Sequence, residues 1–436
     1  MSDTTIRKVQ GRRVWDSRGR PTVEVEVTLA CGSLGRAIAP AGASTGSGEA
    51  LDLRDGGEVL LGMGISRALS AVNGEIAGHL RGKDARDQAG IDNALIALDG
   101  TPNRSRLGGN ATVATSMAVL HAAAAASGEP IWKYLAGAGR VRIPLPEIQI
   151  FGGGAHAARR VDVQDFMVMC PSAGSFSEAL EWTAEVYHAA GSLMKKAGKL
   201  QGVADEGGYW PAFANNEEAL DTLVRAIETA GLKPGRQVVI SLDIAASEFG
   251  KNGRYALALE DRSLDTGQMI DMLGRWLDDY PIASIEDPLA EDDEEGFRAF
   301  TERFGERCQI IGDDFLVTSA RRVAAAVRDR SANAVLIKPN QAGTITEAHE
   351  ALVAGKGAGF GTIVSARSGE TEDVTIAHLA VGWDAGQLKV GSFSRSERMA
   401  KWNEVLRIEE SLYGQAAFAG WAGLGAARET IQKAVA

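Results

Sequence analysis

Apolar and polar positions follow two different rhythms along the chain, and the clearer one begins after residue 140. Short runs rich in β-branched and other apolar residues recur there, at 164–170, 238–244, 281–287, 308–314, 334–339, 361–365 and 388–391. Amphipathic segments lie between them; in one of these, Leu220, Leu223, Val224 and Ile227 share a face. Strands alternating with helices in this way predict a parallel β/α barrel. A doubly wound open sheet is the alternative, but no GxGxxG segment follows a predicted strand.

The first third of the chain is mixed in character. Valines at 23, 25 and 27 alternate with glutamates, which predicts a half-buried strand. Residues 111–126 are rich in alanine and predict a helix. Small residues dominate 40–49, so few side chains there could anchor the segment, and we expect a mobile lid. Small residues and prolines near 137–141 predict a domain boundary.

Ionisable side chains end the predicted strands. Asp243, Glu286 and Asp313 each follow an apolar run, and carboxylates on rigid elements are what a hard cation such as Mg2+ requires. Four further strand ends carry Asp165, Lys338, Arg367 and Lys389. One acidic residue after a strand is more often a helix N-cap. In a barrel, however, the carboxyl ends of all strands meet on one face, so the whole set predicts a functional site.

Composition narrows the function classes. The chain has 436 residues, enough for two domains, and its formal net charge of −11 argues against a nucleic-acid-binding surface. No apolar run resembles a secretion signal or reaches the ~18 residues of a membrane span, so we expect a cytoplasmic protein without a membrane partner. The widely spaced Cys31, Cys170 and Cys308 predict reduced core thiols rather than a disulfide framework.

Motifs in a fixed order over nearly the whole chain carry a family resemblance. They are DSRGRPTVEVEV, GASTG, EALDLRDG, ALDGTPNRSRLGGNA, EVYHAAGSLMKK, DEGG, SEF, YPIASIEDPLAEDD, DDFLVT, IKPNQAGT, RSGETED and RSERMAKWNEVLRIEE. These stretches resemble the enolases, the phosphopyruvate hydratases of glycolysis. The resemblance implies an α/β fold in which residues 1–138 form an N-terminal α+β capping domain, with the lid near 40–49. It also implies that residues 139–436 form an enolase-type (β/α)8 barrel with the metal and catalytic site, unusual in its first strands, and that the protein is a homodimer.

The resemblance also assigns residue roles. The metal ligands it implies are Asp243, Glu286 and Asp313 for one high-affinity Mg2+, with Ser44 joining a second Mg2+ when substrate binds and the lid closes. The catalytic residues it implies are Lys338 as base, Glu206 as acid, Asp165 beside that acid, Lys389 as a cation against the substrate carboxylate, and His156 in the substrate loop. The substrate-binding residues it implies are Arg367, Ser368, Lys389, His156 and Ser44. The substrate is then a small phosphorylated anion, 2-phosphoglycerate.

Charge arguments agree with these roles. Removing a proton beside an ionised carboxylate builds a second negative charge on the same group, so stabilisation by cations must dominate the lowering of the barrier. Mg2+ and Lys389 carry the required charge. Lys338 must be neutral to accept a proton, and nearby divalent cations disfavour its charged form. The departing hydroxide needs a positioned acid such as Glu206.

Departures from the family pattern gather at the leaving-group and phosphate-binding positions. Asp165 stands where enolases have a glutamate, and a shift of ~1 Å at such a position can cost on the order of a hundredfold in rate. Ala366 and Gly48 stand where histidines are usual. The loop after Lys338 reads KPNQAGT rather than KVNQIGT, and GSFSRSER replaces the usual GAPARSER. The metal triad, Lys338 and Lys389 are retained.

These departures favour a specialised enzyme that keeps α-proton abstraction and alters the partner reaction. The chain then resembles the carboxyphosphonoenolpyruvate synthases, enolase relatives that eliminate water from 2-phosphoglycerate and add phosphonoformate, a second, phosphonate substrate. Asp165 and Ala366 would leave space for that anion. Two alternatives stay open: an ordinary glycolytic enolase that makes phosphoenolpyruvate, and a catalytically weak enolase-like binding or scaffold protein.

Overall fold

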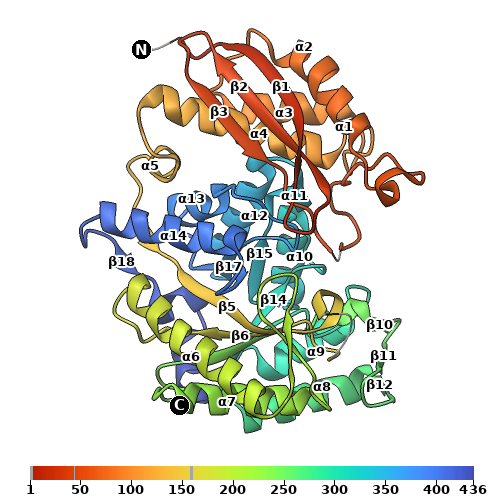
Figure 1. The fold of residues 1–436 in the computed structure, drawn as a ribbon, viewed down its shortest axis with the longest axis vertical. Helices are drawn as coiled ribbons and strands as arrows, with labels where there is room; N and C mark the ends of the chain where they lie inside the picture. Colours follow the sequence, from red (N-terminus) through yellow and green to blue (C-terminus); the bar gives the residue numbers. More distant parts are fainter. Residues whose placement is uncertain (1–2, 44, 158–160) are drawn as a thin grey trace.

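The computed structural model describes residues 3–43, 45–157 and 161–436, in which an N-terminal α/β part lies above a β/α barrel (Figure 1). The strands are β1 (Ile6–Trp15), β2 (Pro21–Leu29), β3 (Leu34–Ile38), β4 (Arg142–Ile143), β5 (Leu145–Gly152), β6 (Asp165–Met169), β7 (Leu200–Val203), β8 (Tyr209–Pro211), β9 (Val239–Asp243), β10 (Gly250–Lys251), β11 (Arg254–Leu257), β12 (Arg262–Asp265), β13 (Ile282–Glu286), β14 (Gln309–Gly312), β15 (Ala334–Ile337), β16 (Gly361–Ser365), β17 (Gln387–Ser392) and β18 (Ala417–Phe418).

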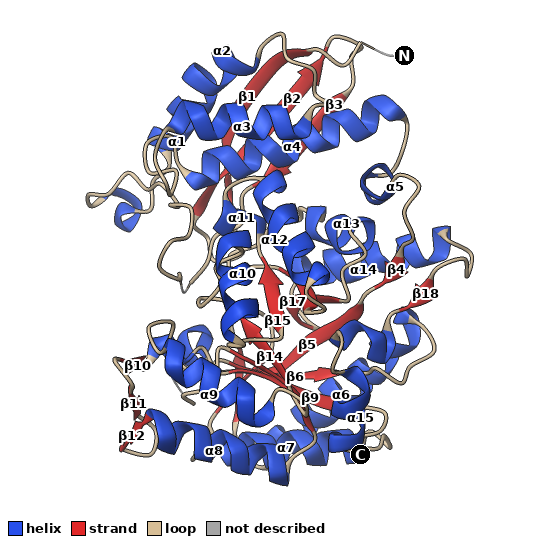
Figure 2. Cartoon of the chain, turned by 180° about the vertical axis from the view of Figure 1, so that it is seen from behind, coloured by secondary structure: helices blue, strands red, loops and turns tan. Residues whose placement is uncertain are grey.

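Helices surround the barrel and cover the N-terminal sheet (Figure 2). They are α1 (Ser66–Ala71), α2 (Ala77–Leu80), α3 (Gln88–Asp99), α4 (Gly109–Ser127), α5 (Ile131–Ala136), α6 (Phe176–Lys196), α7 (Asn216–Thr229), α8 (Thr266–Asp279), α9 (Glu294–Phe304), α10 (Ala320–Asp329), α11 (Pro339–Ala342), α12 (Ile345–Gly357), α13 (Thr375–Gly382), α14 (Ser396–Ser411) and α15 (Arg428–Val435). Shorter helical turns are η1 (Val59–Gly62), η2 (Val72–Ile76), η3 (Gly154–Ala157), η4 (Ala246–Glu248) and η5 (Gly420–Leu424).

Eight strands within the described residues close the barrel. Their hydrogen-bonded order is β17-β16-β15-β14-β13-β9-β6-β5, and β17 pairs with β5 to complete the ring. The barrel prediction is therefore confirmed, and the alternative of a doubly wound open sheet is wrong. The sequence pattern missed β5, because Pro146, Glu147 and Gln149 interrupt its apolar positions although the whole strand is buried.

The direction of β6 departs from a regular barrel, as the family resemblance implied. This strand runs antiparallel to both β5 and β9. Asp165 consequently begins β6 rather than ending it, which corrects the expectation that every site residue follows its strand. The antiparallel register nevertheless sets Asp165 opposite Asp243, so both side chains reach the same rim of the barrel.

Local sequence signals explain where the outer helices begin. Ser175 and Asn215 accept hydrogen bonds from the backbone N–H groups of Glu178 and Glu218, which satisfies free donors in the first turns of α6 and α7. Asp265 and Gln268 form a reciprocal capping box at the start of α8. The apolar faces of these amphipathic helices are buried against the barrel strands, which holds the rim in place.

The N-terminal part contains the antiparallel sheet β1-β2-β3, packed against α4. Val23, Val25 and Val27 are fully buried, as the alternation predicted, but Glu24 is also only 5% exposed because it pairs with Arg12 at 2.5 Å. Backbone hydrogen bonds join this part to the barrel rim, including reciprocal bonds between Ala41 and Gly369. Residues 41–43 and 45–50 therefore lie against the mouth of the barrel, while the exact domain boundary stays a prediction.

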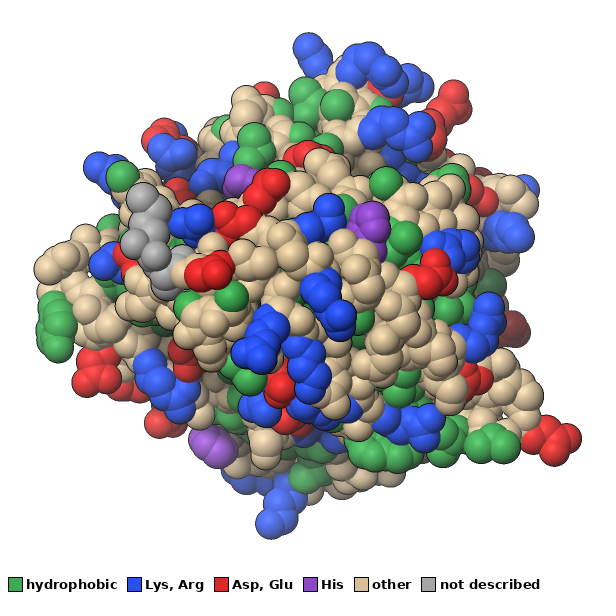
Figure 3. Space-filling view, turned by 90° about the horizontal axis from the view of Figure 1, so that it is seen from above, with side chains coloured by type: hydrophobic (Ala, Val, Ile, Leu, Met, Phe, Trp, Pro, Cys, Tyr) green, Lys and Arg blue, Asp and Glu red, His purple; other side chains and the backbone are tan. Residues whose placement is uncertain are grey.

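Surface features bear on the excluded function classes. Figure 3 shows both acidic and basic side chains on the face seen from above, with several Lys and Arg side chains close together below its centre. Within residues 3–43, 45–157 and 161–436, no helix is long and apolar enough to cross a membrane. Cys170 and Cys308 are buried thiols as expected, but Cys31 is exposed, which corrects the prediction that all three lie in the core.

Candidate active site

A small polar cavity lies at the rim where the strand ends meet. It is lined by His156, Gln164, Asp165, Glu206, Asp243, Lys338, Ser365, Ala366, Arg367, Ser368, Lys389 and Val390. Its volume of about 20 Å3 holds roughly one water molecule. The structure thus brings nearly all the predicted site residues together, and the cavity beside Asp165 and Ala366 is too small in this conformation for a second substrate anion.

Two lysines occupy one half of this rim, each paired with carboxylates. Lys338 follows β15 and donates a hydrogen bond from Nζ to Oδ2 of Asp313, beyond β14. Lys389 on β17 donates to Oδ2 of Asp243 at 2.9 Å and to Oε2 of Glu286 at 2.7 Å. Asp243 and Glu286 are register partners on adjacent parallel strands, which is why their carboxylates meet. We call these five residues the base half.

Burial and charge act against each other in the base half. Burial disfavours the ammonium forms, but the carboxylates of Asp313 and Glu286 together outweigh burial for Lys338, and those around Lys389, led by Asp243 and Glu286, do so for that residue. The pKa values of both lysines are therefore raised. Burial and the neighbouring Asp243 carboxylate raise the pKa of Glu286. The three carboxylates of the base half therefore share only its two lysine ammonium groups, and Asp243 and Glu286 share the same one.

The chemistry of the base half fits a bound hard cation. Its acceptors are all carboxylate oxygens, and Oε1 of Glu286 is buried without a hydrogen-bond partner. Among the described residues, Asp287, Asp313 and Asp314 form a group whose carboxylate oxygens all lie within 4.8 Å of one another. The oxygens of the predicted triad do not form such a group. The lysine ammoniums occupy the space between the triad carboxylates instead. The triad consequently stays a prediction that fits Mg2+.

Asp287 has a different task from the triad. Its two oxygens accept the backbone N–H groups of Asp313 and Asp314, at 2.9 and 2.8 Å. This use of both oxygens fixes the turn after β14. Burial followed by the Asp313 charge raises the pKa of Asp314 to about 8. Asp287 therefore positions Asp313, a contribution that the motif IEDP did not reveal.

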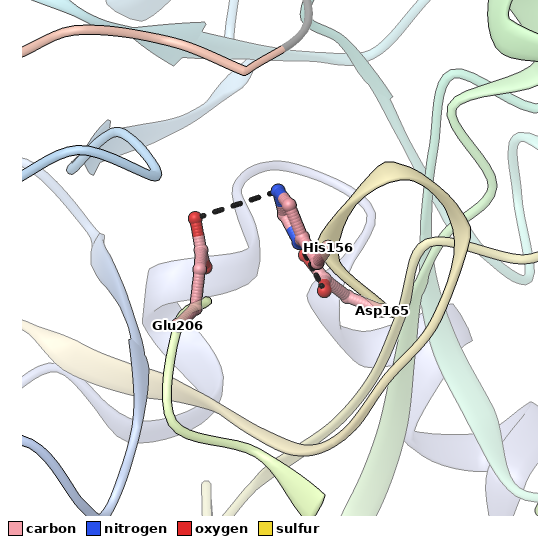
Figure 4. Close-up of side chains that lie close together, drawn as sticks. All are labelled: His156, Asp165 and Glu206. Carbon is pink, nitrogen blue, oxygen red and sulfur yellow. Dashed lines mark hydrogen bonds and ion pairs between the residues drawn. The ribbon is translucent and has the colours of Figure 1, made fainter. Parts of the chain in front are cut away.

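The other half of the rim is organised around His156, as Figure 4 shows. Nδ1 of His156 lies 3.1 Å from Oδ1 of Asp165, and Nε2 lies 3.0 Å from Oγ of Ser368 and 3.8 Å from Oε1 of Glu206. We call His156, Asp165 and Glu206 the leaving-group half. The ligand atoms of these three residues lie within 4.8 Å of one another, as those of a metal site would. The two carboxylates, however, approach different nitrogens of the His156 ring, so the arrangement suits ion pairs with an imidazolium better than a single metal ion.

The leaving-group half holds a charged imidazole. Burial disfavours the imidazolium, but the carboxylates of Asp165 and Glu206 outweigh burial and raise the pKa of His156 to about 9. Burial alone would raise the pKa of Asp165, yet His156 and Lys389 leave it below its ordinary value. An imidazolium donates from both nitrogens, here to Asp165 and Ser368.

The predicted phosphate-binding residues flank both halves. Arg367 donates from Nη1 to Oε2 of Glu49 at 2.9 Å, and burial is outweighed by Glu49 and Asp313, which raise its pKa. Glu49 was not predicted, because a lone glutamate in a small-residue segment carries no distinctive signal. Gln341 was also missed; it donates to Asp313 at 2.9 Å and to Glu49 at 3.2 Å. The predicted ligand Ser44 lies outside the described residues.

Several departures from the family pattern have a local structural reason. Gly48 adopts φ of +98°, a backbone conformation that would be strained for histidine. Pro339 is the first residue of α11, where proline costs no hydrogen bond. Ser394 donates from Oγ to the carbonyl of Gly207 at 2.6 Å and so fixes the loop that carries Glu206. Ala366 is buried beside the cavity, and nothing in the structure explains the loss of a histidine there.

Comparisons with known proteins agree with this geometry. The family described as "Enolase, N-terminal domain" matches residues 6–135, and that described as "Enolase, C-terminal TIM barrel domain" matches residues 140–426. A curated protein named Enolase 1, from Desulfitobacterium hafniense (strain Y51), is 50% identical over 421 residues, covering 96% of each chain.

Proposed function

The chain belongs to the enolase family and is an enzyme of its hydro-lyase class, and we propose that it removes water from 2-phosphoglycerate to give phosphoenolpyruvate. The observation that carries this proposal is the pairing of two halves around one cavity, with buried lysines on one side and a carboxylate–imidazole cluster on the other. Such a division suits a reaction that removes a proton at one carbon and a hydroxyl at the next.

The base half performs the first step. Lys338 accepts the α-proton, and Lys389 faces the substrate carboxylate on which the second negative charge develops. Mg2+ held by Asp243, Glu286 and Asp313 would supply further positive charge against that group. Lys338 must release Asp313 and its own proton before it can act, because the Asp313 pairing raises the pKa of its ammonium.

The leaving-group half performs the second step. Glu206 donates a proton to the departing hydroxyl. The imidazolium of His156 places a positive charge beside Glu206, and Asp165 holds the imidazole ring in position. Arg367 and Ser368 bind the phosphate, which requires Arg367 to share or leave its contact with Glu49. A second Mg2+ that Ser44 would join, and a homodimeric assembly, remain proposals from the family resemblance.

The phosphonate-coupling reaction gains no support from the comparisons. The 50% identical relative carries the name Enolase 1, so the ordinary reaction is at least as well supported as the specialised one. We therefore place dehydration first and treat phosphonoformate as a second reactant to be tested. A binding or scaffold role is less well supported, because residues of the base half and of the leaving-group half line the same cavity.

One experiment decides among these functions. The protein is incubated with 2-phosphoglycerate and Mg2+, and phosphoenolpyruvate is followed with and without phosphonoformate. Rapid phosphoenolpyruvate formation that phosphonoformate does not divert supports the proposed dehydration. Formation of a phosphonate adduct with little free phosphoenolpyruvate would replace it with the coupling reaction, and inactivity in both mixtures would favour a binding protein.

A further inference from the structure

Gln149, on the barrel strand that the sequence pattern missed, contacts Asp165 and the loop that carries Glu206. It is fully buried. Its Nε2 donates a hydrogen bond to Oδ1 of Asp165, and its Oε1 accepts the backbone N–H of Gly208 at 2.8 Å. Gly208 lies two residues after Glu206 in the same loop. One carboxamide therefore connects the Asp165 carboxylate with the loop that carries the proposed acid.

The orientation of this carboxamide is dictated by its partners. A carboxylate offers only acceptors and a backbone N–H only a donor. Turning the amide over would set its oxygen against the Asp165 carboxylate and its NH2 group against the backbone N–H of Gly208, which would leave these buried groups unpaired. Gln149 thus holds Asp165 and the loop in one fixed relation.

Two glycines form the slot that receives the carboxamide. A Cβ atom on Gly208 would lie 2.4 Å from Oε1 of Gln149, whereas one on Gly152 would meet Cβ of Ala204 at 2.6 Å and Nε2 of Gln149 at 3.3 Å. Gly208 has no positive φ among the described backbone outliers, so its lack of a side chain is explained by this close approach rather than by conformation. The slot is shaped to the full length of a glutamine side chain.

The lengths of Gln149 and Asp165 are complementary. Asp165 is one methylene shorter than glutamate, and Gln149 is one methylene longer than asparagine. Oδ1 of Asp165 also accepts a hydrogen bond from Nδ1 of His156 at 3.1 Å, while Oδ2 lies 3.8 Å from Nζ of Lys389. The reach of Gln149 therefore sets the position of the carboxylate that pairs with His156.

We propose that Gln149 is a positioning residue, matched in length to Asp165, that sets the geometry of the leaving-group half. This inference rests on the proposed dehydration. It makes the shorter acid part of a matched pair and removes the need to explain Asp165 by a larger substrate.

A reciprocal change of length tests the proposal. Gln149→Asn and Asp165→Glu should each lower kcat for phosphoenolpyruvate formation on the order of a hundredfold, with KM changed less than about threefold. The double variant moves one methylene from one side chain to the other, and it should recover to within about tenfold of the unchanged enzyme, a strongly non-additive result. Losses that multiply in the double variant would overturn the proposal.

A second readout separates positioning from general damage. Exchange of the substrate α-proton with solvent deuterium depends on the base half, so Gln149→Asn should retain it within about threefold while elimination falls. An equal fall of both rates would overturn a role limited to the leaving-group half. Gln309→Asn is the matched control: Gln309 is a fully buried barrel glutamine that pairs with Ser284 and Gln387, and its variant should keep kcat.

The proposed function and this inference can fail separately. If the unchanged enzyme forms no phosphoenolpyruvate, the proposed function is lost. Crystal structures of the unchanged protein and of Gln149→Asn then decide the inference on geometry alone. A displaced Asp165 carboxylate or Gly208 loop would support it, whereas unchanged positions of both would overturn it.

Discussion

The base half and the leaving-group half of the rim are built by different means. In the base half, the adjacent parallel strands β9 and β13 place Asp243 and Glu286 in register, and Lys389 on β17 contacts both carboxylates directly. In the leaving-group half, His156 lies on a short helical turn, Asp165 begins an antiparallel strand, and Glu206 lies in a loop. Strand register fixes Asp243 and Glu286, whereas His156 and Glu206 lie outside the strands and depend on hydrogen bonds of their turn and loop.

This difference explains where the chain departs from its family. Replacing a carboxylate at the end of a parallel strand would leave a buried lysine unpaired, which is costly. The leaving-group half is joined by hydrogen bonds between side chains, such as that between Gln149 and Asp165, so a change of side-chain length is tolerated there provided that the final hydrogen bonds survive. Changes therefore accumulate in the half that can compensate for them.

The largest expected effect breaks the base half. Lys338→Ala should lower kcat on the order of 10³- to 10⁴-fold and should also abolish exchange of the substrate α-proton, because no base remains within reach. Both rates are measured with 2-phosphoglycerate, the exchange by deuterium incorporation. Lys356→Ala is the control, since Lys356 donates to the carbonyls of Trp383 and Asp384 away from the cavity. Continued exchange in Lys338→Ala would show that another group is the base.

A slightly smaller effect is expected in the leaving-group half. Glu206→Gln keeps the size of the side chain but removes its proton, so elimination should fall on the order of 10²- to 10³-fold while α-proton exchange continues. The control is Glu404→Gln, which alters a comparable carboxylate–histidine contact, 3.4 Å from His378, outside the site. If exchange and elimination fall together in Glu206→Gln, the two halves do not act in separate steps.

The sequence predicted the barrel and the base half for the same physical reason. β-Branched runs identify parallel barrel strands, and the topology then places whatever follows each strand on one rim. The strand pattern therefore led us to expect that Lys338 and Asp313 lie on one rim, and their side chains do meet there. The direction of β6 is not encoded in such a pattern, since parallel and antiparallel buried strands look alike.

The rest of the site depends on tertiary contacts. Gln149 and Glu49 are ordinary polar residues, and their roles arise only when packing brings Asp165 and Arg367 beside them. β5 was missed for a related reason: its buried Glu147 and Gln149 read as solvent-facing positions. A search for apolar runs does not detect strands that bury functional polar residues.

The third prediction concerns the charge that joins the leaving-group half. The pKa of His156 is raised to about 9, against about 6.5 in an unfolded chain. A folded-state pKa above the unfolded one adds stability that is fully present below pH 6.5 and is lost as the pH rises through about 9. One pKa unit corresponds to about 1.4 kcal/mol, so the contribution is about 3 kcal/mol.

Denaturant unfolding of the metal-free protein between pH 6 and pH 10, in the presence of a chelator, measures this contribution. His156→Gln should lose about 3 kcal/mol less of its unfolding free energy across that range than the unchanged protein. His349→Gln serves as the control, because burial lowers the pKa of that histidine instead. Parallel pH profiles for the unchanged protein and His156→Gln would mean that the imidazolium does not hold the half together.

The smallest expected effect tests whether the segment beside Glu49 helps to close the site. Ser47 donates from its backbone N–H and from Oγ to Oε2 of Glu291, at 2.9 and 2.8 Å, and its carbonyl accepts a bond from Arg322. Ser47→Ala removes only the hydroxyl bond, worth about 1 kcal/mol, so KM should rise about fivefold with kcat nearly unchanged. Ser172→Ala removes a similar exposed hydroxyl bond, to the carbonyl of Arg236, and should leave KM unchanged. If KM is the same for Ser47→Ala and the unchanged enzyme, the segment beside Glu49 does not contribute to substrate binding. The base half and the leaving-group half would then have to exclude water without that segment.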